Sequence, residues 1–233
     1  MARQHSKSIP DKNLQEIGGV SLLARSVRTA LATAGLNRVL VSTDGEDLAR
    51  VAMEEGAEVP FLRPRELSRD DSTSWDVVRH AWEYLEQYDS QGVVGVAGIV
   101  LLQPTSPYLW PASIDGALRE FQRAGAPVLK AVRPVADHPT CMLRPRGDLL
   151  VRYSQEKLVR RKELSVLYYP CGAIYIYDRR LMSCSTLDPN EPAAWIELNW
   201  PESMDIDDPE DLLLAQTIAT HGYETETPLQ PVP

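Results

Sequence analysis

The strongest constraint on the fold is the alternation of short apolar runs and helical patterns along the first half of the chain. "RVLVSTD" (38–44), "AEVPFLRP" (57–64), "GIVLLQPTSP" (98–107) and "APVLKAVRPV" (126–135) have the composition of strands. Segments with apolar residues at helical spacing lie between them. Strands that alternate with helices predict a mainly parallel sheet covered by helices on both faces.

The sequence therefore predicts an α/β fold with a Rossmann-like sheet. We expect Ser21 to cap the first helix, which Gly35 ends, and Asp208 to cap the last, with Pro209 as its first residue. The helical segments are 21–35, 45–56, 72–88, 111–125 and 207–222. In such sheets ligands bind beyond the carboxyl ends of the strands, where polar residues end "RVLVSTD" and "LLQPTSP".

The pattern becomes irregular between residues 134 and 170, where short apolar runs mix with basic residues. This segment is expected to form an inserted arm. "CGAIYIYD" (171–178) then resumes a strand, and the last ten residues hold little that could be buried. We predict an α/β part over 1–133, the arm over 134–170, a return to the α/β core over 171–223 and a disordered tail over 224–233.

Composition excludes several classes of protein. The 233 residues, 43% of them hydrophobic, suffice for one large domain with a real core. The net charge of −9 argues against general attraction to nucleic acid or to a membrane surface. Three cysteines without a CxxC pair suggest neither a disulfide framework nor a zinc site. With no signal-peptide pattern and no apolar run of about 20 residues, we expect a cytoplasmic protein.

Basic and hydroxyl-bearing residues gather in "ARQHSKSIPDKN" (2–13), which includes Arg3, Ser6, Lys7, Lys12 and Asn13. Such a loop can neutralise a triphosphate with its cations and donate hydrogen bonds from its hydroxyls and backbone. The alternative is a solvated basic tail. It contains no glycine and is therefore not a Walker-type loop.

A phosphate loop in an α/β fold normally follows a first strand. Here only Met1 and Ala2 precede Arg3, so the first strand is expected to be missing from this chain.

Two carboxylates in "MDIDD" (204–208) are the clearest candidate metal ligands. In an extended segment Asp205 and Asp207 face one side while Ile206 faces the other. Magnesium is commonly held by one or two carboxylates together with substrate phosphates and waters. The alternative is that these acids only cap the final helix, as Asp208 is expected to do.

Six motifs in order resemble the acylneuraminate cytidylyltransferases, or CMP-sialic acid synthetases, and their bacterial relatives acting on other nonulosonic acids. They are "ARQHSKSIPDKNL", "VSTDGEDLARVA", "FLRPRELSRDDSTS", "LLQPTSP", "GAIYIYD" and "MDIDDPEDL". The matches extend over nearly the whole chain. The resemblance implies a homodimeric, Mg²⁺-dependent nucleotidyltransferase that joins CMP from CTP to a nonulosonic acid and releases pyrophosphate.

The resemblance also implies roles for single residues. Lys12 would act on the transferring phosphate, and Asp205 and Asp207 would bind Mg²⁺. The implied nucleotide-binding residues are Arg3, Ser6, Lys7, Asn13, Arg63 and Ser74. The implied sugar-binding residues are Gln103, Tyr175 and Arg161, the last from the dimerisation arm. Either Asp205 or a metal-bound water would take the proton of the sugar hydroxyl.

The departures from the family's motifs cluster on the sugar side. Ser8 stands where a glycine is usual, Cys171 where an asparagine is usual and Cys141 where a lysine is usual. The expected aromatic pair before the final acids is absent from "LDPNEPAAWIEL". Which nonulosonic acid is used stays open, as do transfer to a Kdo-like acid or a sugar phosphate and a non-catalytic or truncated paralogue.

Overall fold

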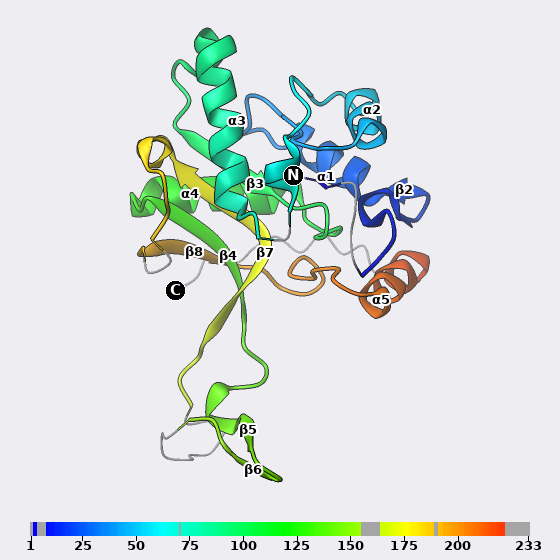
Figure 1. Ribbon diagram of the computed structural model, residues 1–233, viewed down its shortest axis with the longest axis vertical. Helices are drawn as coiled ribbons and strands as arrows, with labels where there is room; N and C mark the ends of the chain where they lie inside the picture. The colour runs from blue at the N-terminus through cyan, green and yellow to red at the C-terminus, as the bar shows by residue number, and fades with distance from the viewer. Residues whose placement is uncertain (1, 4–7, 70, 155–163, 189–190, 222–233) are drawn as a thin grey trace.

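The computed structural model describes residues 2–3, 8–69, 71–154, 164–188 and 191–221 (Figure 1). Its α-helices are α1 (Leu22–Leu31), α2 (Glu46–Glu54), α3 (Ser74–Tyr88), α4 (Pro111–Ala124) and α5 (Pro209–Thr220). Its strands are β1 (Glu16–Ile17), β2 (Val20–Ser21), β3 (Gly98–Leu102), β4 (Val128–Pro134), β5 (Leu143–Arg146), β6 (Leu149–Arg152), β7 (Tyr168–Asp178) and β8 (Ala193–Glu197). Short 3₁₀ turns lie between them, including η1 (Lys12–Leu14).

The central sheet has the strand order β3-β7-β4-β8. Strand β4 runs parallel to β8, whereas β7 runs antiparallel to both β3 and β4. Strands β3, β4 and β8 therefore share one direction, and β7 is inserted against it. The predicted α/β class is confirmed, and β8 is a strand that sequence reasoning missed.

Helices cover both faces of this sheet. Successive residues of β7 point to opposite sides, and each side packs against a different helix. Ile174 and Ile176 are buried with Ile114 of α4 on one face. Tyr177 packs with Trp75 of α3 on the other face, at a ring-centroid distance of 5.2 Å. Complete burial of each isoleucine contributes roughly 1.5–3 kcal/mol to stability.

Two predicted helix starts are confirmed. The Ser21 hydroxyl accepts a hydrogen bond from the Ala24 backbone at 3.2 Å. Asp208 forms a capping box with Asp211, and Pro209 is the first residue of α5. The predicted end of the first helix at Gly35 is wrong, since α1 ends at Leu31.

The predicted strands at 38–44 and 57–64 lie side by side but are not regular strands. They meet at isolated parallel bridges, Leu40 with Glu58 and Thr43 with Leu62. Thr43 also forms a parallel bridge with Ala2. Within the described ranges, Ala2 alone occupies the position of a strand before the basic loop, and β3 is paired on one side only, with β7.

Strands β4 and β7 extend out of the body of the molecule and lead to the β5–β6 hairpin (Figure 1). The β5–β6 hairpin lies within the predicted arm of 134–170, whereas β4 and β7 lie largely outside it. The tail predicted over 224–233 lies outside the described residues. Among the described helices, none combines the length and apolar character needed to cross a membrane.

Candidate functional site

Lys12 joins the start of the chain to the predicted metal-binding segment. Its Nζ atom donates a hydrogen bond to the Ile206 carbonyl at 2.6 Å and lies 3.5 Å from the Asp207 carboxylate. Nearby, the Ser8 hydroxyl donates to the Asp207 carbonyl. The loop at 8–14 is thus fastened to the segment before α5, across almost the full length of the sequence.

The two acids of this segment differ in environment as the extended pattern predicts. Ile206 is fully buried, Asp205 is half-buried, and the Asp207 side chain is 78% exposed. Burial raises the pKa of Asp205, and repulsion by Asp207 raises it further, while Lys12 lowers it. Two carboxylates held close with one ammonium to balance them suit a divalent cation.

Gly172 of β7 closes the other side of Asp205. Its φ angle is +80°, and a Cβ atom there would lie 3.3 Å from the Asp205 carboxylate and 3.8 Å from Nε2 of Gln103. Gln103 follows the end of β3, and the backbone of nearby Thr105 accepts a hydrogen bond from the Ile206 amide. Glycine at 172 therefore permits the close approach that brings Gln103 and Asp205 together.

Tyr175 lies farther along the same strand, opposite Leu101 and Lys130. Burial raises the pKa of its hydroxyl, and the charges of Cys171 and Asp205 raise it further. Tyr175 is therefore a partly buried residue paired on both sides, on the strand that also carries Gly172.

Arg63 is only 5% exposed and lies beneath the start of the chain. It donates hydrogen bonds to the Ala2 carbonyl and to the Ser68 hydroxyl, and it lies 3.7 Å from Asp44. Burial lowers its pKa, although a guanidinium stays charged at neutral pH. A buried cation with a single carboxylate beside it is suited to an anionic ligand.

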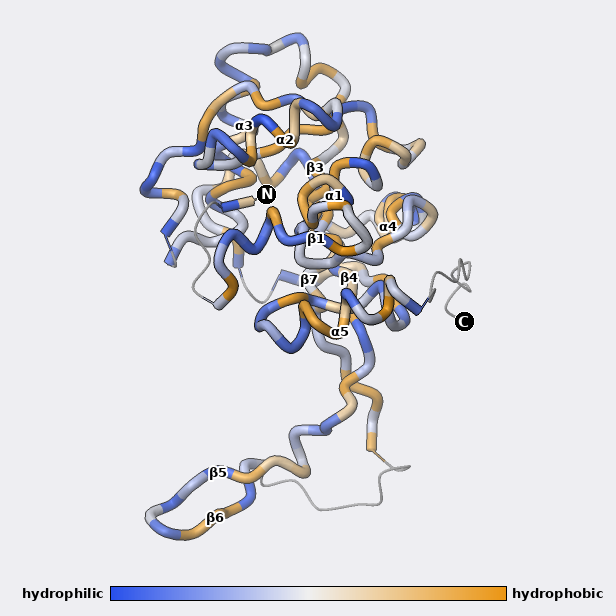
Figure 2. The backbone as a smooth tube through the Cα atoms, turned by 90° about the vertical axis from the view of Figure 1, so that its right-hand side faces the viewer, coloured by the Kyte–Doolittle hydropathy of each residue, from blue (hydrophilic) through white to orange (hydrophobic). Residues whose placement is uncertain are grey.

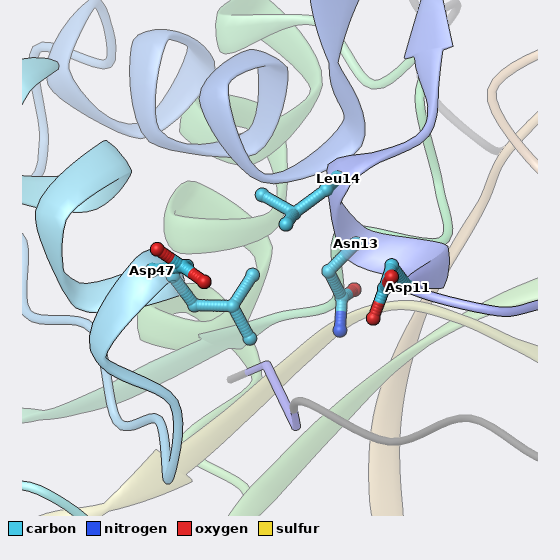
Figure 3. A pocket seen from close by; sticks show the side chains of 5 residues that line it. Asp11, Asn13, Leu14 and Asp47 are labelled. Carbon is cyan, nitrogen blue, oxygen red and sulfur yellow. The ribbon is translucent and has the colours of Figure 1, made fainter.

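Asn13 fixes the first residues of the chain from the other side. It is buried, and its amide donates to the Arg3 carbonyl at 2.9 Å. A small pocket adjoins it, lined by Asp11, Asn13, Leu14, Asp47 and Leu48 (Figure 3). Because Asp11 and Asp47 both line this pocket, it disfavours phosphate and is not the expected seat of a triphosphate.

Glu202 is a positioning residue that sequence reasoning missed. This buried carboxylate accepts hydrogen bonds from the Trp110 amide at 3.1 Å and from the Ser113 hydroxyl. It therefore caps the N-terminus of α4, where Trp110 offers no side-chain cap. The interaction ties α4 to the turn that precedes Asp205. Nothing in the local sequence pairs an acid at 202 with a helix that begins at 111.

Within the described ranges the structure joins the predicted site residues in small groups: Lys12 with Asp207, Asn13 with Arg3, and Gln103 with Asp205 across Gly172. Arg63 contacts Ala2 and Asp44, and Tyr175 is paired within the sheet. Ser74 is the first residue of α3, and no contact joins it to these groups. Ser6, Lys7 and Arg161 lie outside the described residues. Gly172 begins the motif "GAIYIYD", but the sequence alone does not indicate its role. That role follows from its positive φ angle and its nearness to Asp205.

Relatives of known name align with almost the whole chain. It is 31% identical over 226 residues to CMP-N,N'-diacetyllegionaminic acid synthase of Legionella pneumophila, covering 96% of this chain and 95% of that protein. It is 29% identical to N-acylneuraminate cytidylyltransferase of Escherichia coli, covering 93% of this chain and 50% of that longer protein.

Solved structures share the fold at low sequence identity. A CMP:2-keto-3-deoxy-manno-octonic acid synthetase complexed with CTP matches with a TM-score of 0.69 at 18% identity, over 95% of this chain and 96% of the other. The 4-diphosphocytidyl-2C-methyl-D-erythritol synthase of Anaerococcus prevotii matches with a TM-score of 0.62 at 10% identity, over 94% and 93% of the two chains. The family model described as Cytidylyltransferase matches residues 1–185, and the chain belongs to this family.

Proposed function

We propose that this protein transfers CMP from CTP to the anomeric hydroxyl of a nonulosonic acid. The hydroxyl oxygen forms a bond to the α-phosphorus, the bond from that phosphorus to the bridging oxygen breaks, and pyrophosphate leaves. The products are the CMP-sugar, pyrophosphate and the proton of the hydroxyl. The observation that carries the proposal is the convergence of Lys12, Asp205, Asp207 and Gln103 at one sheet edge.

In this mechanism the protein binds and orients more than it reacts. Lys12 stabilises the negative charge that develops on the phosphates, since its ammonium already lies at the edge of the acidic pair. Arg63 holds the nucleotide as a buried cation, and Gln103 and Tyr175 orient the sugar. Either Asp205 or water would take the proton of the hydroxyl.

We propose Mg²⁺ as the cofactor of this site. Asp205 and Asp207 would hold it, and the ion would supply charge neutralisation at the phosphates. The fit is supported by carboxylate chemistry and by the repulsion between the two acids, which one ammonium offsets in part. No larger cluster of His, Cys, Asp and Glu suited to a metal occurs among the described residues.

We propose that the active form is a homodimer joined through the arm. The described part of the arm exposes a set of large apolar side chains. They are Met142, Leu143, Leu149, Leu150, Tyr153, Val166 and Leu167. Figure 2 shows this part of the arm projecting from the body, with hydrophobic and hydrophilic residues mixed along its backbone. Exposed apolar groups in this number favour a partner surface. Light scattering coupled to gel filtration tests this, and a monomer at micromolar concentration would contradict it.

A substrate panel tests the proposed activity. The wild-type chain is incubated with CTP, Mg²⁺ and one acid at a time: N,N'-diacetyllegionaminic, N-acetylneuraminic, pseudaminic or Kdo. We expect pyrophosphate release with one nonulosonic acid clearly preferred. Release with Kdo alone would contradict the substrate class, and release with none would contradict the activity.

A further inference from the structure

Arg133 is a cation near the candidate site to which neither the sequence motifs nor the relatives assign a role. It lies near the end of β4, directly opposite Tyr169 of β7 in the antiparallel ladder. Its guanidinium carbon stands 5.3 Å from the centre of the Tyr169 ring. The side chain is exposed, and no acid of the described residues forms a salt bridge with it. Stacking on the ring orients the guanidinium without using its hydrogen-bond donors.

A wide bulge in β7 brings this pair next to the acidic end of the site. Lys130 is opposite Tyr175, whereas Val132 is opposite Pro170, so two steps along β4 correspond to five along β7. Three extra residues of β7 are therefore accommodated between these two pairs. The bulge contains Gly172, which contacts Asp205 and Gln103. Bulges of this kind change the direction of neighbouring side chains and are common beside active sites.

Cys171 stands between the two ends of this arrangement. Burial raises the pKa of its thiol, and the carboxylate of Asp205 raises it further, whereas the charge of Arg133 lowers it. Cys171 itself lies inside the bulge, between Pro170, which is opposite Val132, and Gly172, which adjoins Asp205. One end of the region is acidic, and the other carries the guanidinium of Arg133.

We propose that Arg133, oriented by Tyr169, binds the carboxylate of the sugar acid. This inference rests on the proposed function. A carboxylate is repelled by Asp205 and Asp207 and attracted by a guanidinium, which it can meet with two parallel hydrogen bonds. Lys12 and Arg63 are assigned to the phosphates and the nucleotide, whereas the Arg133 guanidinium stacks on Tyr169 and forms no salt bridge with a described acid. With a cation at one end and acids at the other, the site would bind the sugar acid in a single orientation.

The test uses each nonulosonic acid that proves to be a substrate. Its rate is compared with the rate of the corresponding C1 carboxamide, which is isosteric but uncharged. We expect wild-type protein to prefer the acid by at least about 10-fold in kcat/KM, as typical for a hydrogen bond to a charged group. Arg133→Gln should raise the KM of the acid by about that factor, leave the KM of CTP unchanged and bring the acid-to-amide preference near one. Arg133→Lys should restore part of the preference.

Arg119→Gln is the matched control, because Arg119 is exposed on α4 and should leave both constants unchanged. Thermal unfolding of each variant confirms that it is folded. Wild-type activity together with an unchanged acid-to-amide preference in Arg133→Gln would overturn this inference alone. An equal rise of KM for acid and amide would also overturn it, by placing Arg133 against another part of the sugar. Wild-type protein inactive with every acid would overturn the proposed function, and this inference with it.

Discussion

The ammonium of Lys12 lies 3.5 Å from the carboxylate of Asp207, although the two residues come from opposite ends of the chain. The lysine side chain is 13% exposed and the aspartate side chain 78%. The pair therefore has one fixed and one solvated partner. Because its aspartate is solvated, the pair contributes little to stability, and its position beside Asp205 fits a role in ligand binding.

The first prediction concerns the acid of this pair. Asp207→Asn keeps the size of the side chain but removes a ligand charge, so turnover should fall by about 10²-fold or more, as for loss of one key electrostatic group. The measurement is pyrophosphate release as a function of Mg²⁺ concentration. Higher Mg²⁺ should recover part of the loss.

Asp208→Asn is the matched control for that variant. Asn caps helices as well as Asp, so α5 should keep its N-terminus and activity should stay near that of the wild type. An equal loss of turnover in the two variants would mean that both acids act by capping α5, and it would contradict the proposed metal site.

The second prediction separates the two cations of the site. Lys12→Ala should mainly lower kcat, because its ammonium acts on charge that develops during the transfer. Arg63→Ala should mainly raise the KM for CTP, because this buried cation holds the nucleotide in the ground state. Steady-state kinetics with varied CTP checks both. Normal constants in both variants would exclude Lys12 and Arg63 from nucleotide binding and transfer.

The third prediction concerns Gly172. Gly172→Ala places a methyl group 3.3 Å from Asp205 at a φ of +80°, so it should lower stability by about 1–2 kcal/mol and also lower turnover strongly. Gly147→Ala is the control, since Gly147 has a φ of +60° in the β5–β6 turn with no atom near its Cβ position. Chemical denaturation and turnover are measured for both. A similar loss of turnover in both variants would contradict the role of Gly172 at the site.

These sites differ in how far the sequence could predict them. The pair at 205 and 207 was predictable because alternation in an extended segment depends only on residues two apart. The arrangement of Gly172 against Asp205 was not, since it depends on a bulge whose extra residues are defined only by pairing with β4. Likewise β8 was missed, because its five residues "AAWIE" carry too little β-branched character to predict a strand alone.

The fourth prediction concerns pH and Glu202. Burial raises the pKa of this carboxyl, while its hydrogen bonds from Ser113 and Trp110 oppose the rise. Because the pKa of Glu202 is higher in the folded state, folding favours the protonated carboxyl. The protonated carboxyl contributes fully to stability below the unfolded pKa of about 4.3. This contribution is lost as the pH rises through the folded pKa. Glu202→Gln mimics the protonated form and removes this loss.

The stability of Glu202→Gln relative to wild type should therefore increase between about pH 4 and pH 7. Urea unfolding at each pH measures it, with Glu86→Gln on the exposed face of α3 as the control. A difference that stays constant with pH would contradict the shifted pKa of Glu202.

The most direct measurement of the central claim is the identity of the products. Wild-type protein with CTP, Mg²⁺ and the preferred nonulosonic acid is followed by ³¹P NMR, and the sugar nucleotide is weighed by mass spectrometry. We expect one pyrophosphate per CMP-sugar, with a phosphodiester signal that appears as CTP disappears, and no product when the acid is omitted. Release of pyrophosphate without a CMP-sugar, or hydrolysis of CTP that ignores the acid, would contradict the central claim.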